Sequence, residues 1–226
     1  MKVEVIAHTP DMETVVAAAA RLCYSEQGAT ELMKNFTSDK VEKFVKKLVS
    51  LGHESPMEHA SITFAIEGIS RACSHQLVRH RVGASYSQKS QRYVKEDDFD
   101  YIIPPSIAKD VYRKNMFDCA MDRMKSLYVH LIKMGVSAED ARFILPNATA
   151  TSLVVTMNVR SLWHFFELRC CNRAQWEIRA LANEMLKQAR EIAPLLFAKA
   201  GATCDTVGIC FEGNMCCGKC KNVAER

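Results

Sequence analysis

The sequence predicts a mixed fold in which a few strands stand among many helices, on three observations. Residues 2–8 and 61–67 alternate apolar with polar side chains, which is typical of strands that bury one face. Residues 153–157 form a short β-branched run that favours a strand buried on both faces. Apolar residues recur at helical spacing in most other segments, most clearly over residues 178–196.

Polar residues and glycine predict where several helices begin and end. Thr9 is expected to cap the first helix, with Pro10 at its first position. Ser38 and Ser137 are the expected caps of two later helices, and Gly52 is expected to end the helix that starts at Ser38. The predicted helices cover residues 10–23, 38–51, 70–80, 110–134, 137–142, 162–169 and 178–196.

Length and composition restrict the class of protein. With 226 residues, 48% of them hydrophobic, the chain can bury a sizeable core, and we expect one domain. A net charge of +4, with both signs interspersed, is too mild for a general nucleic-acid binder. The first residues do not resemble a secretion signal, and no apolar run approaches the roughly 20 residues of a membrane helix, so we expect a cytoplasmic protein without a membrane partner. The ten cysteines are then expected to be reduced, metal-bound or in the core.

One stretch, residues 79–95, concentrates positive charge and hydroxyl groups. No Asp or Glu occurs in residues 68–95, which contain Arg71, Arg79, Arg81, Lys89, Arg92 and Lys95. A polyanion or a phosphorylated small molecule suits such a field, although a solvated basic loop would have the same composition. In an extended segment Gln88, Ser90 and Arg92 would project to one side and converge on one ligand.

The motifs of this stretch resemble those of the flavin-dependent thymidylate synthases. That family's signature is Arg-His-Arg, a spacer and then Ser-x-Arg-Tyr, and four further blocks are similar in order and approximate spacing. The matching residues here are Arg79-His80-Arg81, Ser90-Gln91-Arg92-Tyr93, His53-Glu54-Ser55-Pro56-Met57-Glu58-His59, Ala141-Arg142-Phe143-Ile144-Leu145-Pro146, Asn158-Val159-Arg160-Ser161-Leu162, and Leu168-Arg169 with Ala174-Gln175-Trp176-Glu177-Ile178.

The resemblance implies a fold and a reaction. The fold is α+β, with a small central antiparallel sheet packed with several helices, in a homotetramer whose sites are shared between subunits. The reaction is the reductive methylation of dUMP to dTMP in dTTP biosynthesis. Methylenetetrahydrofolate supplies the carbon, NADPH the electrons, and FAD relays them. Residues 1–200 would form the catalytic domain and residues 201–226 a Cys/Gly-rich tail.

The resemblance also assigns residues to sites. It gives Arg169 the catalytic role of stabilising the ionised uracil ring, which needs a cation at its O2/N3 edge; a surface arginine on an amphipathic helix is the alternative. His53 is expected to contact folate or NADPH, or else to be structural. The implied dUMP site contains Gln76, Arg79, Gln88, Lys89, Ser90, Gln91, Arg92, Arg142 and Arg169. The implied FAD site contains Ser55, Arg79, His80, Arg81, Gln88, Asn158, Arg160 and His164.

The chain departs from the family pattern at a few positions. Arg81 and Ser90 are separated by one residue more than usual, as though Gly83 were inserted, and a glycine can absorb such a bulge at low steric cost. Gln88 stands where some members have Glu, while His164 and Arg173 stand where some have Asn and His.

Three alternatives stay open. The first is a non-catalytic nucleotide or nucleic-acid binding module that uses residues 79–95 and the tail. The second is a conventional thymidylate synthase with a cysteine nucleophile, but none of the cysteines lies in that family's Pro-Cys setting. Ser90 as an activated nucleophile is the third, and ligand binding is preferred because the resemblance implies no enzyme nucleophile.

No metal is expected, although the tail leaves one candidate set of ligands. Four thiolates suffice for a tetrahedral zinc, but the spacing here contains a single C-x-x-C pair. A disordered or redox-sensitive tail is the other interpretation. The candidate ligands are Cys204, Cys210, Cys216, Cys217 and Cys220.

Overall fold

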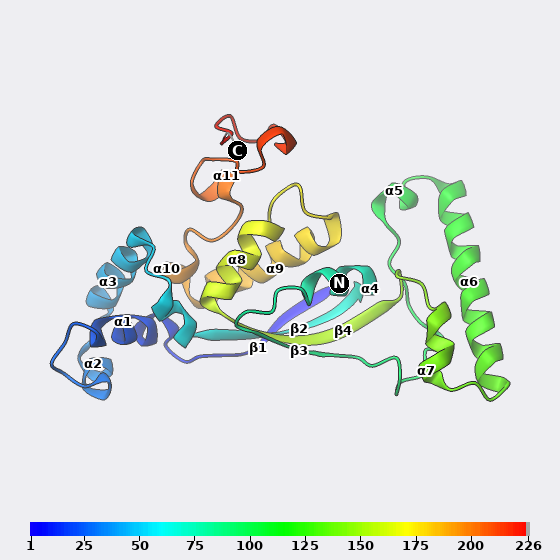
Figure 1. Cartoon of the computed structure of the whole chain (residues 1–226), viewed down its shortest axis with the longest axis horizontal. Coiled ribbons are helices and arrows are strands. Elements are labelled where there is room, and N and C mark those ends of the chain that lie inside the picture. Colours follow the sequence, from blue (N-terminus) through cyan, green and yellow to red (C-terminus); the bar gives the residue numbers. More distant parts are fainter. Residues whose placement is uncertain (225–226) are drawn as a thin grey trace. The chain divides into compact units, whose positions relative to one another are not determined.

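The computed structural model describes residues 1–224 and has an α+β fold with one four-stranded sheet in the order β1-β2-β4-β3 (Figure 1). Backbone hydrogen bonds from Thr9 N to Ser61 O and from Lys89 N to Ser152 O, among others, fix an antiparallel register throughout. The predicted α+β class and the antiparallel sheet are therefore confirmed. The strands are β1 (Lys2–His8), β2 (Ser61–Ser70), β3 (Ala84–Gln88) and β4 (Ala150–Asn158).

The helices fall into two compact units, and each strand contributes residues to both units. The first unit comprises Met1–Lys2, Ile66–Arg79 and Tyr86–Val154, and the second comprises Val3–Ala65, His80–Ser85 and Val155–Arg226. The first unit holds α4 (Arg71–Leu77), α5 (Pro105–Ala108), α6 (Val111–Lys133), α7 (Ala138–Ala141) and the 3₁₀ turn η2 (Arg142–Ile144). The second holds α1 (Met12–Leu22), α2 (Ala29–Asn35), α3 (Ser38–Leu51), η1 (Ser55–His59), α8 (Val159–Arg169), α9 (Trp176–Ile192), α10 (Pro194–Phe197), α11 (Thr203–Thr206) and η3 (Gly213–Met215).

The core of the second unit is aromatic. The ring centroids of Phe165 and Phe166 on α8 lie 5.7 Å apart, and those of Phe166 and Phe197 lie 6.1 Å apart. All three side chains are fully buried, at about 2 to 3 kcal/mol of transfer free energy each. Trp163 Nε1 donates to Leu196 O at 3.0 Å, which connects α8 to α10. This packing holds α8, and with it the residues at both of its ends, in one orientation.

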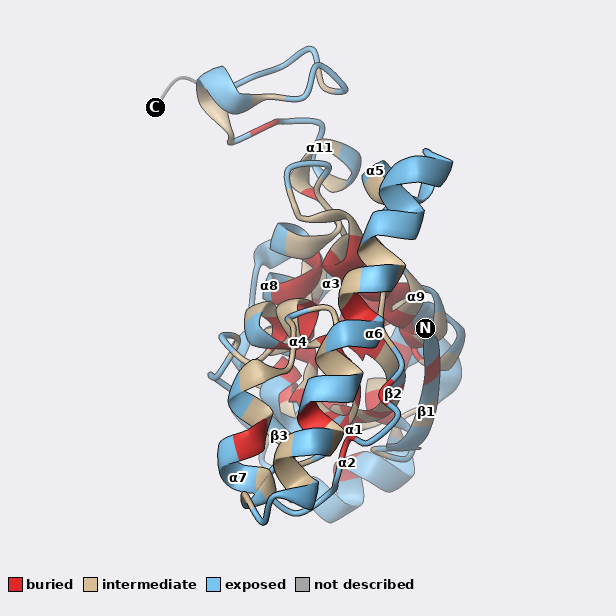
Figure 2. Ribbon diagram, turned by 90° about the vertical axis from the view of Figure 1, so that its right-hand side faces the viewer, coloured by how far each residue is buried: buried red, intermediate tan, exposed pale blue. Residues whose placement is uncertain are grey.

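Helix α6 dominates the first unit and is largely exposed (Figure 2). Its buried residues are Met121 and Tyr128, and the Tyr128 hydroxyl accepts a hydrogen bond from Glu96 N at 3.3 Å. Val111 and Tyr112 at its start are 77% and 73% exposed. An apolar surface of this kind marks a site that another molecule can cover.

Several sequence predictions are confirmed. The first strand covers residues 2–8, and Gly52 ends α3 in the left-handed conformation with φ 68°. Ser137 caps α7 because its side chain accepts from Asp140 N. The helix predicted over residues 110–134 is confirmed as α6, which Asp110 caps by accepting from Arg113 N.

The predicted start of the first helix is wrong. Helix α1 begins at Met12 after Asp11, which has a left-handed φ of 46°, and neither Thr9 nor Pro10 is helical. Thr9 instead continues the pairing with β2, where its hydroxyl accepts from Ser61 N at 3.0 Å and its own N–H bonds Ser61 O. Strand pairing therefore takes the groups that a helix cap would have used.

Three further boundaries or burial patterns differ from the predictions. In β4 Val155 is fully buried but Val154 is 37% exposed, so this strand buries one face and not both. Ser38 is the first helical residue of α3, and Thr37 precedes it without a side-chain cap. Helix α9 ends at Ile192 because Pro194, which lacks a backbone N–H, starts the separate α10.

Candidate functional site

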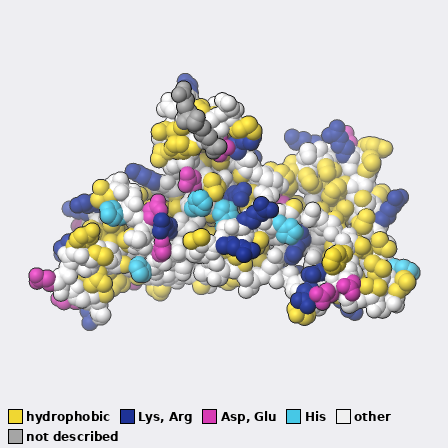
Figure 3. Space-filling model, in the orientation of Figure 1, with side chains coloured by type: hydrophobic (Ala, Val, Ile, Leu, Met, Phe, Trp, Pro, Cys, Tyr) yellow, Lys and Arg dark blue, Asp and Glu magenta, His cyan; other side chains and the backbone are white. Residues whose placement is uncertain are grey.

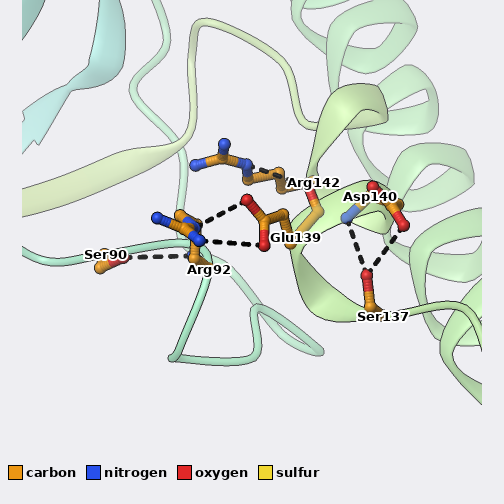
Figure 4. Close-up of polar contacts among 6 residues, drawn as sticks. All are labelled: Ser90, Arg92, Ser137, Glu139, Asp140 and Arg142. Carbon is orange, nitrogen blue, oxygen red and sulfur yellow. Dashed lines mark hydrogen bonds and ion pairs between the residues drawn. The ribbon is translucent and has the colours of Figure 1, made fainter.

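In the first unit, a carboxylate orients one of two neighbouring guanidinium groups. Arg92 makes a two-point ion pair with Glu139, with Nε to Oε1 at 2.8 Å and Nη2 to Oε2 at 3.1 Å, while Arg142 Nε donates to the Glu139 carbonyl at 3.0 Å (Figure 4). The Arg92 and Glu139 side chains are about half exposed, so their pair adds little to stability. The pair does fix the direction of Arg92, and Arg142 has no ion pair within residues 1–224.

The Arg92 loop departs from the extended form that we predicted. Strand β3 ends at Gln88, and the chain then turns so that Ser90 O accepts from Val94 N at 3.0 Å and Ser90 Oγ from Arg92 N at 3.3 Å. The expectation that Gln88, Ser90 and Arg92 share one side of a strand is therefore wrong. A serine hydroxyl that bonds the backbone two residues on stabilises such turns.

Gln88 and Lys89 project to different partners. The Gln88 amide nitrogen donates to Ser74 Oγ at 2.9 Å and to Thr151 Oγ1 at 3.3 Å, which leaves its carbonyl oxygen without a hydrogen bond among residues 1–224. Lys89 Nζ instead pairs at 3.0 Å with Glu96, a carboxylate only 5% exposed. Gln88 is thus positioned as an acceptor, whereas the Lys89 side chain is held by a buried acid.

Arg71 is one of the cations of residues 68–95, but the motifs assigned it to no site. Burial, and next the charge of Arg142, lower the pKa of Arg71, so the two guanidinium groups lie within electrostatic reach of each other. Neighbouring like charges of this kind favour an anion between them. The available signal was the position of Arg71 inside the acid-free interval and directly after Ser70, the side-chain cap of α4.

The remaining predicted residues of the first unit are placed less tightly. The helix predicted over residues 70–80 is shorter in the structure, where α4 ends at Leu77 and the chain leaves the helix before Arg79. Arg79 is exposed and forms no ion pair with any residue in the described part of the chain. Gln91 is half-buried, and its amide nitrogen is buried without a hydrogen-bond partner.

In the second unit, Arg169 is hydrogen-bonded to a histidine. Arg169 Nε donates to His80 Nε2 at 3.0 Å, and the His80 ring stands edge-on to Phe165 with centroids 5.0 Å apart. Burial, and then the charges of Arg169 and His164, lower the pKa of His80 to about 4. At neutral pH His80 is therefore uncharged and can accept the Arg169 hydrogen bond. Histidine and basic side chains lie side by side over α8 in Figure 3.

At Gly83 the loop after His80 packs closely against the start of α8. The Gly83 φ of 64° is left-handed, and a Cβ added there would lie 2.3 Å from Ser161 Oγ and 2.4 Å from Asn158 Nδ2. Asn158 caps α8 through Oδ1, which accepts from Ser161 N at 2.8 Å, and Asn158 N donates to Gly83 O at 3.0 Å. Ser161 Oγ donates to Val82 O at 2.6 Å. As expected, the glycine takes a conformation that other residues adopt only with strain.

Arg160 is already paired with two acids from the block around Ser55. Its Nε lies 3.1 Å from Glu54 Oε2, and Nη1 lies 2.5 Å from Glu58 Oε1. All three side chains are about half exposed, so the network is accessible to solvent and to ligands. Nothing in the local sequence links the two glutamates to a residue about a hundred positions further on, so their role could not be predicted from the motifs.

Each unit thus gathers its own part of the predicted residues. His53 is exposed just after α3, Ser55 opens η1, and His164 is exposed on α8. The first unit holds Gln76, Arg79, Gln88, Lys89, Ser90, Gln91, Arg92 and Arg142. The second holds His53, Ser55, His80, Arg81, Asn158, Arg160, His164 and Arg169.

The candidate zinc ligands are not assembled. Over residues 1–224 no three or more His, Cys, Asp or Glu side chains are grouped to hold a metal ion. The tail thiols make other contacts: Cys216 bonds Cys220 O at 3.8 Å, and Cys217 accepts from Asn172 Nδ2 at 3.5 Å. The tail is not without structure either, since Cys210 forms a β-bridge with Val223.

Replacing His80 with glutamine is expected to flatten the dependence of stability on pH. The folded pKa of about 4 lies below the ordinary value of 6.5, so between these values the unfolded chain binds a proton that the native chain does not. Native stability is therefore lost as pH falls from 6.5 toward 4, while glutamine still accepts from Arg169 without titrating. Melting temperatures at pH 7 and pH 5 check this: the wild type should lose several degrees more than His80→Gln, and equal losses would contradict the assignment.

The fold and these clusters define a class: an α+β protein whose guanidinium and amide groups suit ligands that carry phosphate. Within the described residues no helix is long and apolar enough to cross a membrane. Comparisons with known proteins identify the family. The family described as thymidylate synthase complementing protein matches residues 4–195.

The relatives match over nearly the whole chain. The chain is 54% identical to the flavin-dependent thymidylate synthase of Geobacter sulfurreducens over 225 residues. This alignment covers 99% of this chain and 96% of the relative. The chain is 50% identical to that of Clostridium tetani, over 97% of this chain and 94% of the relative. The corresponding values for Pyrococcus furiosus are 43%, 95% and 91%. The chain belongs to the flavin-dependent thymidylate synthase family, which confirms the resemblance of its motifs.

Proposed function

We propose that this protein catalyses the reductive methylation of dUMP to dTMP, with methylenetetrahydrofolate as the carbon donor and NADPH as the reductant. The observation that carries the proposal is the Arg169 guanidinium, held at 3.0 Å by an uncharged histidine in a chain of this family. A cation at the O2/N3 edge of uracil stabilises the ionised ring, whose C5 then carries the electron density that methylation needs. A neutral His80 orients the guanidinium without competing with it for that negative charge.

Most of the proposed nucleotide contacts belong to the first unit. Arg92, directed by Glu139, and Arg142 supply donors for the phosphate, and the Gln88 carbonyl can accept from an N–H of the base. Arg71 is added to this site as a second positive charge beside Arg142. The proposed dUMP contacts are Gln76, Arg79, Gln88, Lys89, Ser90, Gln91, Arg92, Arg142 and Arg169, of which Lys89 would contribute its backbone.

The residues proposed for FAD have the chemistry that a dinucleotide needs. Arg79 and Arg81 are exposed and have no ion pair with any described residue, so they are available to a pyrophosphate. Bound there, FAD would supply hydride transfer between NADPH and the methylene carbon. Ser161 and Gly83 hold the loop that carries His80 and Arg81 in place. The proposed contacts are Ser55, Arg79, His80, Arg81, Gln88, Asn158, Arg160 and His164, and His53 is proposed to contact folate or NADPH.

The proposal includes a cytoplasmic homotetramer with sites shared between subunits. The apolar side chains that α6 exposes, among them Val111 and Tyr112, support a covering partner of this kind. Residues 1–200 are proposed as the catalytic domain and residues 201–226 as the tail, whose last two residues lie outside the described part of the chain. The family match, which ends at residue 195, supports this division.

Flavin binding tests the proposed function directly. Purified protein should be yellow, or become yellow with added FAD, and its flavin absorbance should bleach when NADPH is added anaerobically. Subsequent addition of dUMP and methylenetetrahydrofolate should restore the colour as dTMP forms. Protein that is colourless after incubation with excess FAD and removal of the unbound flavin would support the non-catalytic binding module instead.

A further inference from the structure

The second unit has a groove that is lined by none of the residues proposed for the reaction. It is a cavity of about 510 Å³ between α1, α2 and α3, which is within the range of small-molecule sites. Its apolar part consists of Leu32, Phe36 and Phe44, and the two phenylalanine ring centroids are 6.2 Å apart. The amides of Gln27 and Asn35 complete the uncharged part of the lining. The three helices follow one another near the start of the chain (Figure 1).

The rim of this groove is entirely basic. It carries Arg21, Lys40, Lys43 and Lys47, and no Asp or Glu belongs to the lining. None of these four cations forms an ion pair with any carboxylate of residues 1–224, although other lysines of the chain do. Lys46, for example, pairs with Glu42 on the same helix but outside the groove. Unpaired like charges around an apolar surface are what an anionic ligand with an apolar part would neutralise.

The spacing of the cations limits the shape of the ligand. Lys40, Lys43 and Lys47 follow the three- and four-residue spacing of one helical stripe, so they share a face of α3. At about 1.5 Å per residue they extend over roughly 10 Å, which is too long for a single phosphate to engage them all. The ligand that fits is an aromatic or apolar group attached to an extended chain of several negative charges.

We propose that the groove between α1, α2 and α3 is a second binding site, for a small molecule that joins an aromatic group to an extended oligoanion. Phe36 and Phe44 would pack against the aromatic group, and Lys40, Lys43 and Lys47 would bind the charged chain. A nucleoside triphosphate and an aromatic oligoglutamate share this chemistry, with phosphates in one case and carboxylates in the other. An acidic membrane surface differs because it presents charge over a plane rather than along a line.

The test uses two probes with the full-length protein. Thymidine triphosphate and p-aminobenzoyl-triglutamate are titrated separately by calorimetry at physiological ionic strength. We expect at least one of the two probes to bind saturably in the groove, with one site per chain. The probe that binds shows whether phosphates or carboxylates supply the negative charge of the ligand. Binding to this site should weaken about tenfold or more in the double variant Lys43→Ala/Lys47→Ala.

A matched control separates the groove from general electrostatics. Lys34→Ala/Lys46→Ala removes the same charge from exposed positions of α2 and α3 that do not line the groove, and it should leave the affinity within about twofold. Circular dichroism would establish that both variants fold. Equal weakening by both pairs, binding that neither pair changes, or no binding of either probe would overturn the proposal. Binding to anionic vesicles alone, with the same sensitivity to the groove lysines, would also overturn it.

Discussion

Replacing Arg169 with alanine is expected to lower the rate of uracil methylation by about 100- to 1000-fold, the usual effect of removing one donor that stabilises a developing negative charge. The Arg169 side chain is oriented by its hydrogen bond to His80, and the His80 ring in turn packs edge-on against the buried Phe165. Its removal takes away a charge without opening the core. Flavin content and the melting temperature should therefore change little, while dTMP formation in a single turnover should nearly stop.

The control for this variant is Arg173→Ala, which removes an exposed arginine in the turn between α8 and α9. Arg173 approaches a carboxylate, that of Glu212, only at 4.0 Å, so its removal should leave the methylation rate within a few fold. The variant Arg169→Lys keeps the charge but not the planar fork, and we expect it to recover only part of the activity. Full turnover in Arg169→Ala would remove the proposed catalytic role.

Replacing Gly83 with alanine, in the loop that we propose to contact FAD, is expected to lower the free energy of unfolding by about 2 to 4 kcal/mol. The added Cβ would lie 2.3 Å from Ser161 Oγ and 2.4 Å from Asn158 Nδ2. Neither side chain can retreat freely, because Ser161 holds Val82 O and Asn158 caps α8. We expect a lower denaturation midpoint together with a weaker affinity for FAD, measured by urea unfolding and by flavin titration.

Gly52→Ala separates backbone strain from the steric clash. Gly52 has a φ of 68°, close to the 64° of Gly83, but a Cβ there would meet nothing within 4 Å. Strain alone should cost about 1 kcal/mol in this control, and flavin affinity should not change. If both variants lose the same stability and both keep flavin, the loop does not depend on the contact between Gly83 and α8.

Local chemistry explains which elements the sequence could predict. The first strand, the helix that ends at Gly52 and the cap at Ser137 each depend on residues within a few positions of one another, and all three predictions are confirmed. The Thr9 cap failed because Ser61, far along the chain, offered the backbone of Thr9 a strand partner. Helix propensity cannot account for that competition, because it depends on contacts distant in sequence.

The same distinction between local features and contacts distant in sequence applies to the candidate site. Motif blocks located Arg92, Arg142 and Arg169, and they also led to the family. They did not predict that Glu139 directs Arg92 or that His80 accepts from Arg169, since those contacts form only after the chain folds. The extended form of the Ser90 loop was wrong for a local reason, because a serine hydroxyl stabilises a turn.

The identity of the folate product tests the central claim most directly. Reducing a methylene to a methyl group takes two electrons, and if NADPH supplies them through FAD, the folate leaves as tetrahydrofolate. The protein should therefore convert dUMP, methylenetetrahydrofolate and NADPH into equal amounts of dTMP, tetrahydrofolate and NADP⁺, and only when flavin is bound. Dihydrofolate formed in equal amount to dTMP, without consumption of NADPH, would mean that the folate itself supplies the electrons and would contradict the account.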